Sequence, residues 1–170
     1  RSLVGSEMCI RDRSNVYMKN KILLLGLFCC SLISAKAQVL LDKGTGKNSF
    51  PIVSSSTNAV ICFDGKDATV VRKSASLFVD DVRRVTGQEL RIDESKPGKV
   101  SARYAIIAGT IGKSEWIDAL VSRHKIDTAA IAGSWERYMI EVVNNPIPGI
   151  KKAIVVAGSA RRGTAYGLRS

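Results

Sequence analysis

The residues best placed to do chemistry are two arginines near the end of the chain. Arg161 and Arg162 lie in the run GSARRGTAYG at residues 158–167, which follows the apolar run AIVVA at residues 153–157. The apolar run predicts a buried strand, and the glycines after it predict a turn. Loops that follow buried elements often carry functional side chains. This pattern therefore indicates a site at the end of the last strand.

Two glycine-containing turns are similar to phosphate-binding loops, but neither fits the motif. The run GTIGKS at residues 109–114 ends in the required lysine and hydroxyl residue, yet Ile107 stands where the motif needs its first glycine. Gly158 and Gly163 have the right separation, but Thr164 replaces the lysine. We therefore expect a tight strand-to-helix turn at residues 109–114, with Ser114 near the helix cap, and no nucleotide cofactor.

The residue types offer no catalytic or metal-binding set. His124 is the only histidine in the sequence, and we expect it at a helix carboxyl end, where an imidazole favours the helix dipole. Asp80 and Asp81 are adjacent on an expected helix, so their side chains point about 100° apart and do not converge on one substrate. Carboxylates brought together from distant segments stay an open alternative. From the residues alone we expect no catalytic residues, no cofactor and no metal.

The first 49 residues are expected to lie outside the folded domain. Residues 1–17 show no apolar period and are interpreted as a non-native leader. Residues 18–37 have the layout of a secretory signal peptide, with a basic start, an apolar run at 22–33, and Ala35 and Ala37 before the cleavage point. A buried first helix is the alternative. Residues 38–49 are expected to form a flexible lead. From the signal-peptide layout we expect a secreted or periplasmic protein with no membrane segment after cleavage.

Without residues 1–37 the charge and the cysteine count both fall. The full chain carries 26 basic and 15 acidic residues, a net charge of +11, whereas residues 38–170 keep 20 basic and 13 acidic residues, a net charge of +7. The basic residues are scattered without interleaved aromatic residues, so no nucleic-acid partner is expected. Of four cysteines only Cys62 remains, which excludes an internal disulfide or a cysteine zinc site. Its apolar neighbours predict a buried strand residue.

The hydrophobic pattern predicts strands and helices from residue 50 to the end. Strands are expected at 50–53, 59–63, 90–93, 104–108, 137–142 and 153–157. A first helix is expected between Asp67 as N-cap and Gly87 as its stop, with apolar residues at helical spacing: Val71, Ala75, Phe78, Val82 and Val85. A second spans 114–124 with Trp116 turned inward, and a third begins near residue 159. This order predicts an α/β (α+β) mixed-sheet domain with helices on one face.

Five motifs in this order resemble the amino-terminal domain of glycoside hydrolase family 115, the xylan α-1,2-glucuronidases. They are FPIV at 50–53, DDVRRVTG at 80–87, GTIGKS at 109–114, WERY at 135–138 and GSARRGTAYG at 158–167. The resemblance covers about residues 48–167. It implies that residues 50–170 form a small α/β accessory domain, like domain 2 of β-hexosaminidases, ahead of a (β/α)₈ catalytic barrel. Catalytic carboxylates of barrel enzymes lie on barrel loops, so the resemblance places them beyond Ser170 and implies that this chain is inactive by itself.

The resemblance also implies a role for the arginines. In an enzyme that removes glucuronic acid or its 4-O-methyl form from glucuronoxylan, Arg161 or Arg162 would bind the uronate carboxylate through paired N–H groups, with Ser159 beside them. The alternative for both arginines is a structural ion pair where the domain meets the barrel. Ala160 departs from the family, which usually has an acidic residue there. If that acid caps the next helix or orients an arginine, the alanine weakens the function, and ordinary variation is the alternative.

Three functions fit these observations. The leading one is a non-catalytic amino-terminal domain of a secreted glycoside hydrolase, with the polysaccharide and the barrel of the same chain as partners. The second is a stand-alone carbohydrate-binding or adhesion module, although Trp116 and Trp135 are the only tryptophans available for a sugar platform. The third is an accessory domain of another hydrolase, such as a hexosaminidase.

Overall fold

The computed structural model describes residues 50–170. The expected leader at 1–17, signal peptide at 18–37 and lead at 38–49 lie outside the described residues. Within the described part, no helix is long and apolar enough to cross a membrane.

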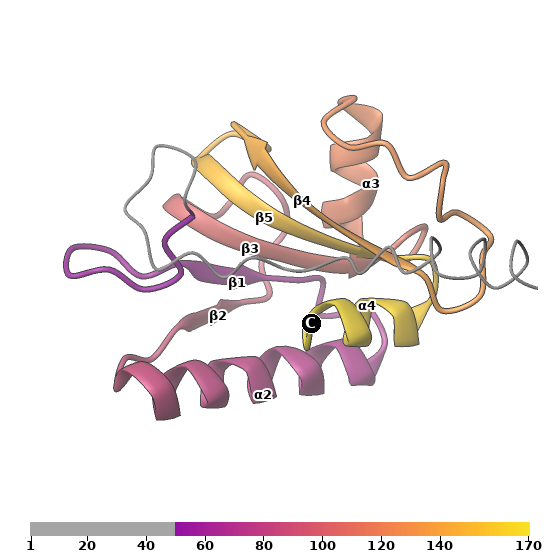
Figure 1. The fold of residues 1–170 in the computed structure, drawn as a ribbon. Helices are drawn as coiled ribbons and strands as arrows, with labels where there is room; N and C mark the ends of the chain where they lie inside the picture. Colours follow the sequence, from indigo (N-terminus) through magenta and orange to yellow (C-terminus); the bar gives the residue numbers. More distant parts are fainter. Residues whose placement is uncertain (1–49) are drawn as a thin grey trace, which may run out of the picture. The chain divides into compact units, whose positions relative to one another are not determined.

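Five strands form one mixed sheet in the order β2-β1-β3-β5-β4 (Figure 1). They are β1 (Val60–Cys62), β2 (Arg91–Asp93), β3 (Ala102–Thr110), β4 (Tyr138–Asn144) and β5 (Ile150–Gly158). Strand β1 runs parallel to β2 and to β3, and β3 runs parallel to β5. Strand β4 is antiparallel to β5 and forms one edge of the sheet. The mixed sheet predicted from the sequence is therefore confirmed.

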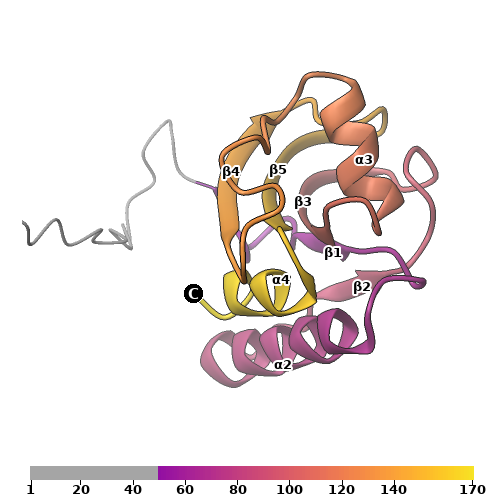
Figure 2. The ribbon, with the colours of Figure 1, turned by 90° about the vertical axis from the view of Figure 1, so that its right-hand side faces the viewer.

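The helices cover both faces of the sheet, so the prediction of helices on one face is wrong. Helices α2 (Thr69–Thr86) and α4 (Arg161–Gly167) lie side by side on one face, and α3 (Glu115–Ser122) lies on the other (Figure 2). The pattern of β3 explains this arrangement. Ala105 and Ile107 pack with the α3 core, whereas Ile106 and Ala108 pack with the α2 core. A strand that is apolar on both sides needs a covering layer on each.

Each face of the sheet carries its own core. The α3 side contains Trp116, Ile117 and Leu120, all fully buried, which confirms the inward position expected for Trp116. The other side contains Val71 and Ala75 of α2 among its buried residues. Burying these apolar surfaces supplies the main favourable term for folding.

Several element boundaries differ from the predictions. Residues 50–53 form no strand, although the carbonyl of Ile52 accepts a hydrogen bond from the amide of Ala59 at 2.9 Å. The N-cap of α2 is Ala68 rather than Asp67. Gly87 does end α2, with a left-handed φ of 72° that glycine adopts readily. Val85, expected on the apolar face of this helix, is 85% exposed.

Candidate functional site

The carboxyl ends of β1, β3 and β5 meet at one edge of the sheet, because these strands are parallel. The helix after β1 covers one face and the helix after β3 covers the other (Figure 2). A reversal of this kind is a topological switch point, where open α/β sheets leave a crevice outside the strand ends. The loops after the three strands therefore define the candidate site.

A pocket of about 490 Å³ lies among these three loops. Its lining includes three cationic side chains, one from each loop: Lys66, Lys113 and Arg161. All three residues are exposed. Asp67 supplies the one carboxylate among the described residues that line the pocket. We call this space the switch-point pocket. Its volume lies within the roughly 300–1,000 Å³ usual for small-molecule sites.

Asp67 ties the first loop to the end of β3. One carboxylate oxygen accepts the backbone N–H of Thr110 at 2.7 Å, and the other accepts the N–H of Ala68 at 2.7 Å. Thr110 is buried, so its amide needs this partner in place of water. Asp67 was expected as a helix cap, and its bond to a strand 43 residues away carries no local sequence signal.

Asp64 makes a similar link to the start of α3. Its Oδ2 atom accepts the backbone N–H of Glu115 at 3.0 Å, and its Oδ1 atom accepts the N–H of Lys66 at 2.9 Å. The amide of Glu115 is one of the free N–H groups at the helix start, and a carboxylate there is favourable. The two aspartates together fix the loop that carries Lys66.

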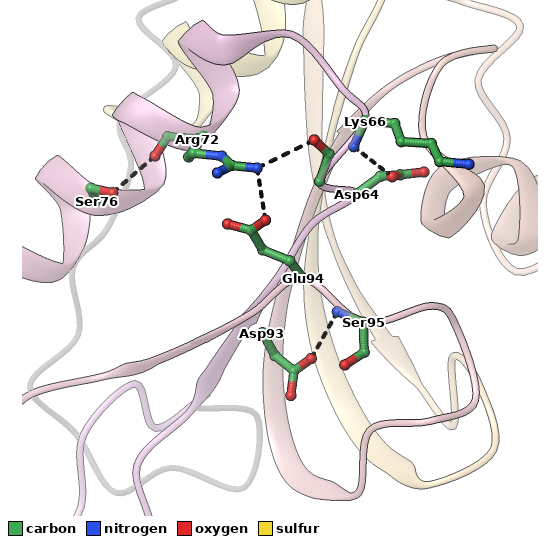
Figure 3. A network of polar contacts seen from close by, with 8 residues as sticks. Asp64, Lys66, Arg72, Ser76, Asp93, Glu94 and Ser95 are labelled. Carbon is green, nitrogen blue, oxygen red and sulfur yellow. Dashed lines mark hydrogen bonds and ion pairs between the residues drawn. The ribbon is translucent and has the colours of Figure 1, made fainter.

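A second set of polar contacts supports the same loop from outside (Figure 3). Arg72 of α2 donates to the carbonyl of Gly65 at 3.3 Å and to Oε2 of Glu94 at 2.7 Å. The side chain of Lys66 extends away from the Arg72–Glu94 pair in this view. Lys66 is thus held by its backbone while its ammonium group stays outside the network.

Neighbouring Asp93 keeps its charge readily. A side-chain hydrogen bond from Ser95 lowers the pKa of Asp93 below its usual value, against a smaller opposing effect of burial. The backbone N–H of Ser95 also donates to Asp93 at 2.9 Å, as Figure 3 shows. Nearby Arg91 lowers the pKa further.

The third loop is held by a buried contact between α4 and β3. The hydroxyl of Thr164, which has no exposed surface, donates to the carbonyl of Gly109 at 3.1 Å and lies 3.0 Å from the hydroxyl of Thr110. A Cβ atom on Gly158 would overlap the backbone nitrogen of Thr164, and one on Gly163 would overlap the carbonyl of Arg137. The two glycines that flank the SARR run at residues 159–162 therefore serve close packing of α4.

The structure separates the three predicted site residues. Arg161 lines the switch-point pocket. Arg162 does not, because its guanidinium pairs with Glu136 at 2.9 Å, and this hydrogen bond and charge raise the pKa of Arg162. Ser159 lines the pocket, but its hydroxyl bonds the backbone N–H and the carbonyl of Arg137, each at 3.0 Å. Arg162 thus forms an ion pair within the described domain, whereas the substrate role expected for these residues stays a prediction.

A smaller space of about 120 Å³ gathers three carboxylates, from Asp64, Glu94 and Glu115. Each has a partner. Asp64 bonds two backbone amides, Glu94 pairs with Arg72, and Glu115 pairs with Lys96 at 3.2 Å. Two catalytic carboxylates would need a sugar between them, and this space is too small and its acids too fully engaged for that role.

Cys62 and His124, which the sequence also singled out, do not line the switch-point pocket. Cys62 is fully buried, and burial with the nearby charge of Asp93 raises the pKa of its thiol to about 12. His124 follows the end of α3 with a φ of 52°, and its backbone N–H donates to the carbonyl of Val121. Among residues 50–170, no group of three or more His, Cys, Asp or Glu side chains could hold a metal ion.

Comparison with known proteins gives a similarity to a solved enzyme. No protein-family model matches the chain, and no curated protein matches it. A solved structure described as a family GH115 4-O-methyl-α-glucuronidase, BtGH115A, with specificity for decorated arabinogalactans, is 32% identical, with a TM-score of 0.48. The match covers 65% of this chain and 12% of that one. Over that part, the chain resembles a segment of a family 115 glucuronidase, the family that its five motifs indicate.

Proposed function

We propose that residues 50–170 form a non-catalytic accessory domain of a glycoside hydrolase similar to the family 115 α-glucuronidases. The observation that carries this proposal is the state of the carboxylates at the sheet edge. Asp67, in the switch-point pocket, is engaged by two backbone amides. In the smaller space Asp64 also binds two backbone amides, and Glu94 and Glu115 form ion pairs. Glycoside hydrolysis needs two carboxylates flanking the scissile bond, and neither of these two spaces at the strand ends offers a free pair.

The similarity to a solved enzyme supports the accessory role. The chain spans 12% of the length of the glucuronidase that it matches, which leaves most of that enzyme outside the matched segment. We propose that the catalytic barrel is supplied by another part of such an enzyme. The substrate would then be a polysaccharide that carries glucuronic acid or its 4-O-methyl form, either glucuronoxylan or a decorated arabinogalactan.

Export to the periplasm or the medium is part of the same proposal. It rests on the signal-like pattern of residues 18–37.

An exposed apolar face marks where the rest of an enzyme would pack. Ile140 and Val142 of β4 are 48% and 46% exposed. They pair in register with Val156 and Ile154, which belong to the core on the α2 side. Tyr166 of α4, half exposed, is a further large apolar residue on the surface of this side. We propose that this β4–α4 face, defined by Ile140, Val142 and Tyr166, is covered by the remainder of the hydrolase.

An activity assay tests the proposal. The purified 170-residue chain is incubated with glucuronoxylan and, separately, with decorated arabinogalactan, and free (4-O-methyl)glucuronic acid is measured. We expect release at the level of buffer alone, whereas a family 115 enzyme run in parallel releases the acid. Turnover by the chain that rises with protein concentration would refute the non-catalytic assignment.

The alternative of a carbohydrate-binding module rests on Trp135. Its side chain is 83% exposed, and it precedes Glu136, which pairs with Arg162. An exposed tryptophan offers an apolar ring face to a sugar. Binding to insoluble polysaccharide that is lost in Trp135→Ala would favour the module, whereas binding unchanged by that substitution would count against it.

A further inference from the structure

The geometry points to the switch-point pocket as a binding site for an anionic sugar, with Lys66, Lys113 and Arg161 as the residues that recognise its carboxylate. The identification of the anion as a uronate rests on the proposed function. The anion site itself rests on the charges and contacts of the pocket.

The first observation is the lack of partners for the three cations. Ion pairs formed among the described residues involve Arg72, Arg83, Arg91, Lys96 and Arg162. Within residues 50–170, no carboxylate lies within ion-pair distance of Lys66, Lys113 or Arg161. Like charges that share one pocket repel each other, and an anion bound between them relieves that repulsion.

The second observation is that the pocket's own acid does not neutralise these cations. Asp67 accepts two backbone N–H groups at 2.7 Å, so its oxygen atoms are turned to the backbone of Ala68 and Thr110. Three cations against one acid leave an excess positive charge in the pocket lining.

The third observation is that the three cations come from loops with fixed backbones. Asp64 holds the amide of Lys66, Asp67 holds that of Thr110, and Ser159 bonds Arg137 beside Arg161. Lys113 donates its backbone N–H to the carbonyl of Thr110. A site with a fixed backbone loses less entropy when it binds a ligand.

The size and chemistry of the pocket favour a monosaccharide acid. A volume of about 490 Å³ accommodates a sugar ring, and Arg161 offers the planar pair of N–H donors that suits a carboxylate. The apolar part of the lining includes Ile111 and Ala68, against which the carbon face of a sugar can pack. A neutral sugar can accept hydrogen bonds from the three cations but gains no charge attraction from them.

The test is an NMR titration of the ¹⁵N-labelled 170-residue chain with glucuronate, glucose and inorganic phosphate. We expect glucuronate to shift the amide signals of Lys66, Thr110, Lys113 and Arg161, with an affinity on the order of 1 mM, as befits exposed ion pairs. Glucose should leave these signals in place, and phosphate should bind more weakly than glucuronate.

Charge-removing variants show whether the pocket is the cause. Lys113→Ala and Arg161→Ala should each weaken glucuronate binding by about fivefold, the upper end for an exposed ion pair. The matched control is Lys151→Ala, because Lys151 is an exposed lysine near the start of β5, at the opposite end of the strand. The affinity of the Lys151→Ala variant for glucuronate should equal that of the unchanged chain.

Three results would overturn the inference. The first is that glucose and glucuronate shift the amide signals equally. The second is that Lys151→Ala and Lys113→Ala weaken glucuronate binding equally, and the third is that no anion shifts these signals. Phosphate binding as tight as glucuronate binding would overturn the uronate assignment. None of these results changes the expected absence of glucuronic acid release, so failure of the pocket is distinguishable from failure of the proposed function.

Discussion

Side chains near the carboxyl ends of β1, β3 and β5 have roles that their residue types alone do not indicate. Arg161 and Arg162 are neighbours in sequence, yet one lines the switch-point pocket and the other forms an ion pair with Glu136. Asp64 and Asp67 have the chemistry of catalytic acids, but both bind backbone amides. Residue type indicates what a side chain can do, and the partner brought by the fold decides what it does.

Asp67 should contribute measurably to stability. Asp67→Ala leaves the buried amide of Thr110 without its partner, and an unsatisfied buried donor costs about 1–3 kcal/mol. The free energy of unfolding, measured with urea, should fall by that amount. Asp81→Ala is the matched control, because Asp81 is an exposed aspartate in the middle of α2. Equal stability of the two variants would show that the link between Asp67 and β3 is unimportant.

The thiol of Cys62 should be inert in the folded chain. Burial raises its pKa from 9.0 to about 12, so at pH 8 to 9 the folded protein keeps it protonated and out of contact with reagents. In a chain with Cys9→Ser, Cys29→Ser and Cys30→Ser, alkylation should be slow without denaturant and fast with it. Alkylation at similar rates under both conditions would contradict the buried position.

The same shift gives a pH dependence of stability. Because the pKa of Cys62 is higher in the folded state, its contribution is complete below pH 9 and is lost as the pH rises from 9 towards 12. The loss amounts to at most about 1.4 kcal/mol per pH unit. Cys62→Ala should therefore lose less stability than the unchanged chain between pH 9 and 11, as measured by urea unfolding at each pH.

At the scale of elements, the sequence predicted the central strands and the helices well. The apolar runs at 104–108 and 153–157 both lie inside nine-residue strands, and Gly87 ends α2 as expected. These features depend on local pattern, and local pattern is visible in one sequence. The placement of α3 on the opposite face was missed, although the apolar residues on both sides of β3 carried that information.

The meeting of the loops after β1, β3 and β5 in one pocket could not be predicted, because it depends on contacts between residues far apart in the sequence. The bond from Asp67 to Thr110 spans 43 residues, and that from Thr164 to Gly109 spans 55 residues. The glycine-flanked turn singled out Arg161, which lines the switch-point pocket. Lys66 and Lys113 could be placed in the same pocket only once the strand order was known, since no spacing rule relates residues on three separate loops.

Ala160 offers a prediction about helix α4. It is the N-cap residue with an extended backbone, φ −146° and ψ 167°, and it makes no side-chain cap bond. Asp or Ser suits this position, so Ala160→Asp and Ala160→Ser should each raise the free energy of unfolding by about 1 kcal/mol. Thermal or urea unfolding measures this gain, and a loss of stability in both variants would contradict the cap geometry.

The pair of variants also separates capping from charge. Ala160 lines the switch-point pocket, so Ala160→Asp adds an acid beside the three cations, whereas Ala160→Ser does not. Glucuronate binding should weaken in the aspartate variant and stay unchanged in the serine variant. Equal affinity in both would argue that the cations do not govern binding.

At the scale of the whole molecule, the described domain carries one exposed apolar face, the β4–α4 face. Ile140 and Val142 are about half exposed on an edge strand, which is an arrangement that soluble proteins usually cover. The proposed accessory role accounts for this face, because the remainder of a hydrolase would bury it.

The central claim is that residues 50–170 are equivalent to the matched segment of a family 115 glucuronidase. The direct measurement is the rate of 4-O-methylglucuronic acid release from decorated arabinogalactan by a chimera of that enzyme in which residues 50–170 replace the matched segment. The same enzyme with the segment deleted is the control. The account predicts a folded chimera whose rate lies within about tenfold of the parent, a barrier difference of about 1.4 kcal/mol. A soluble, folded chimera no more active than the deletion would contradict it.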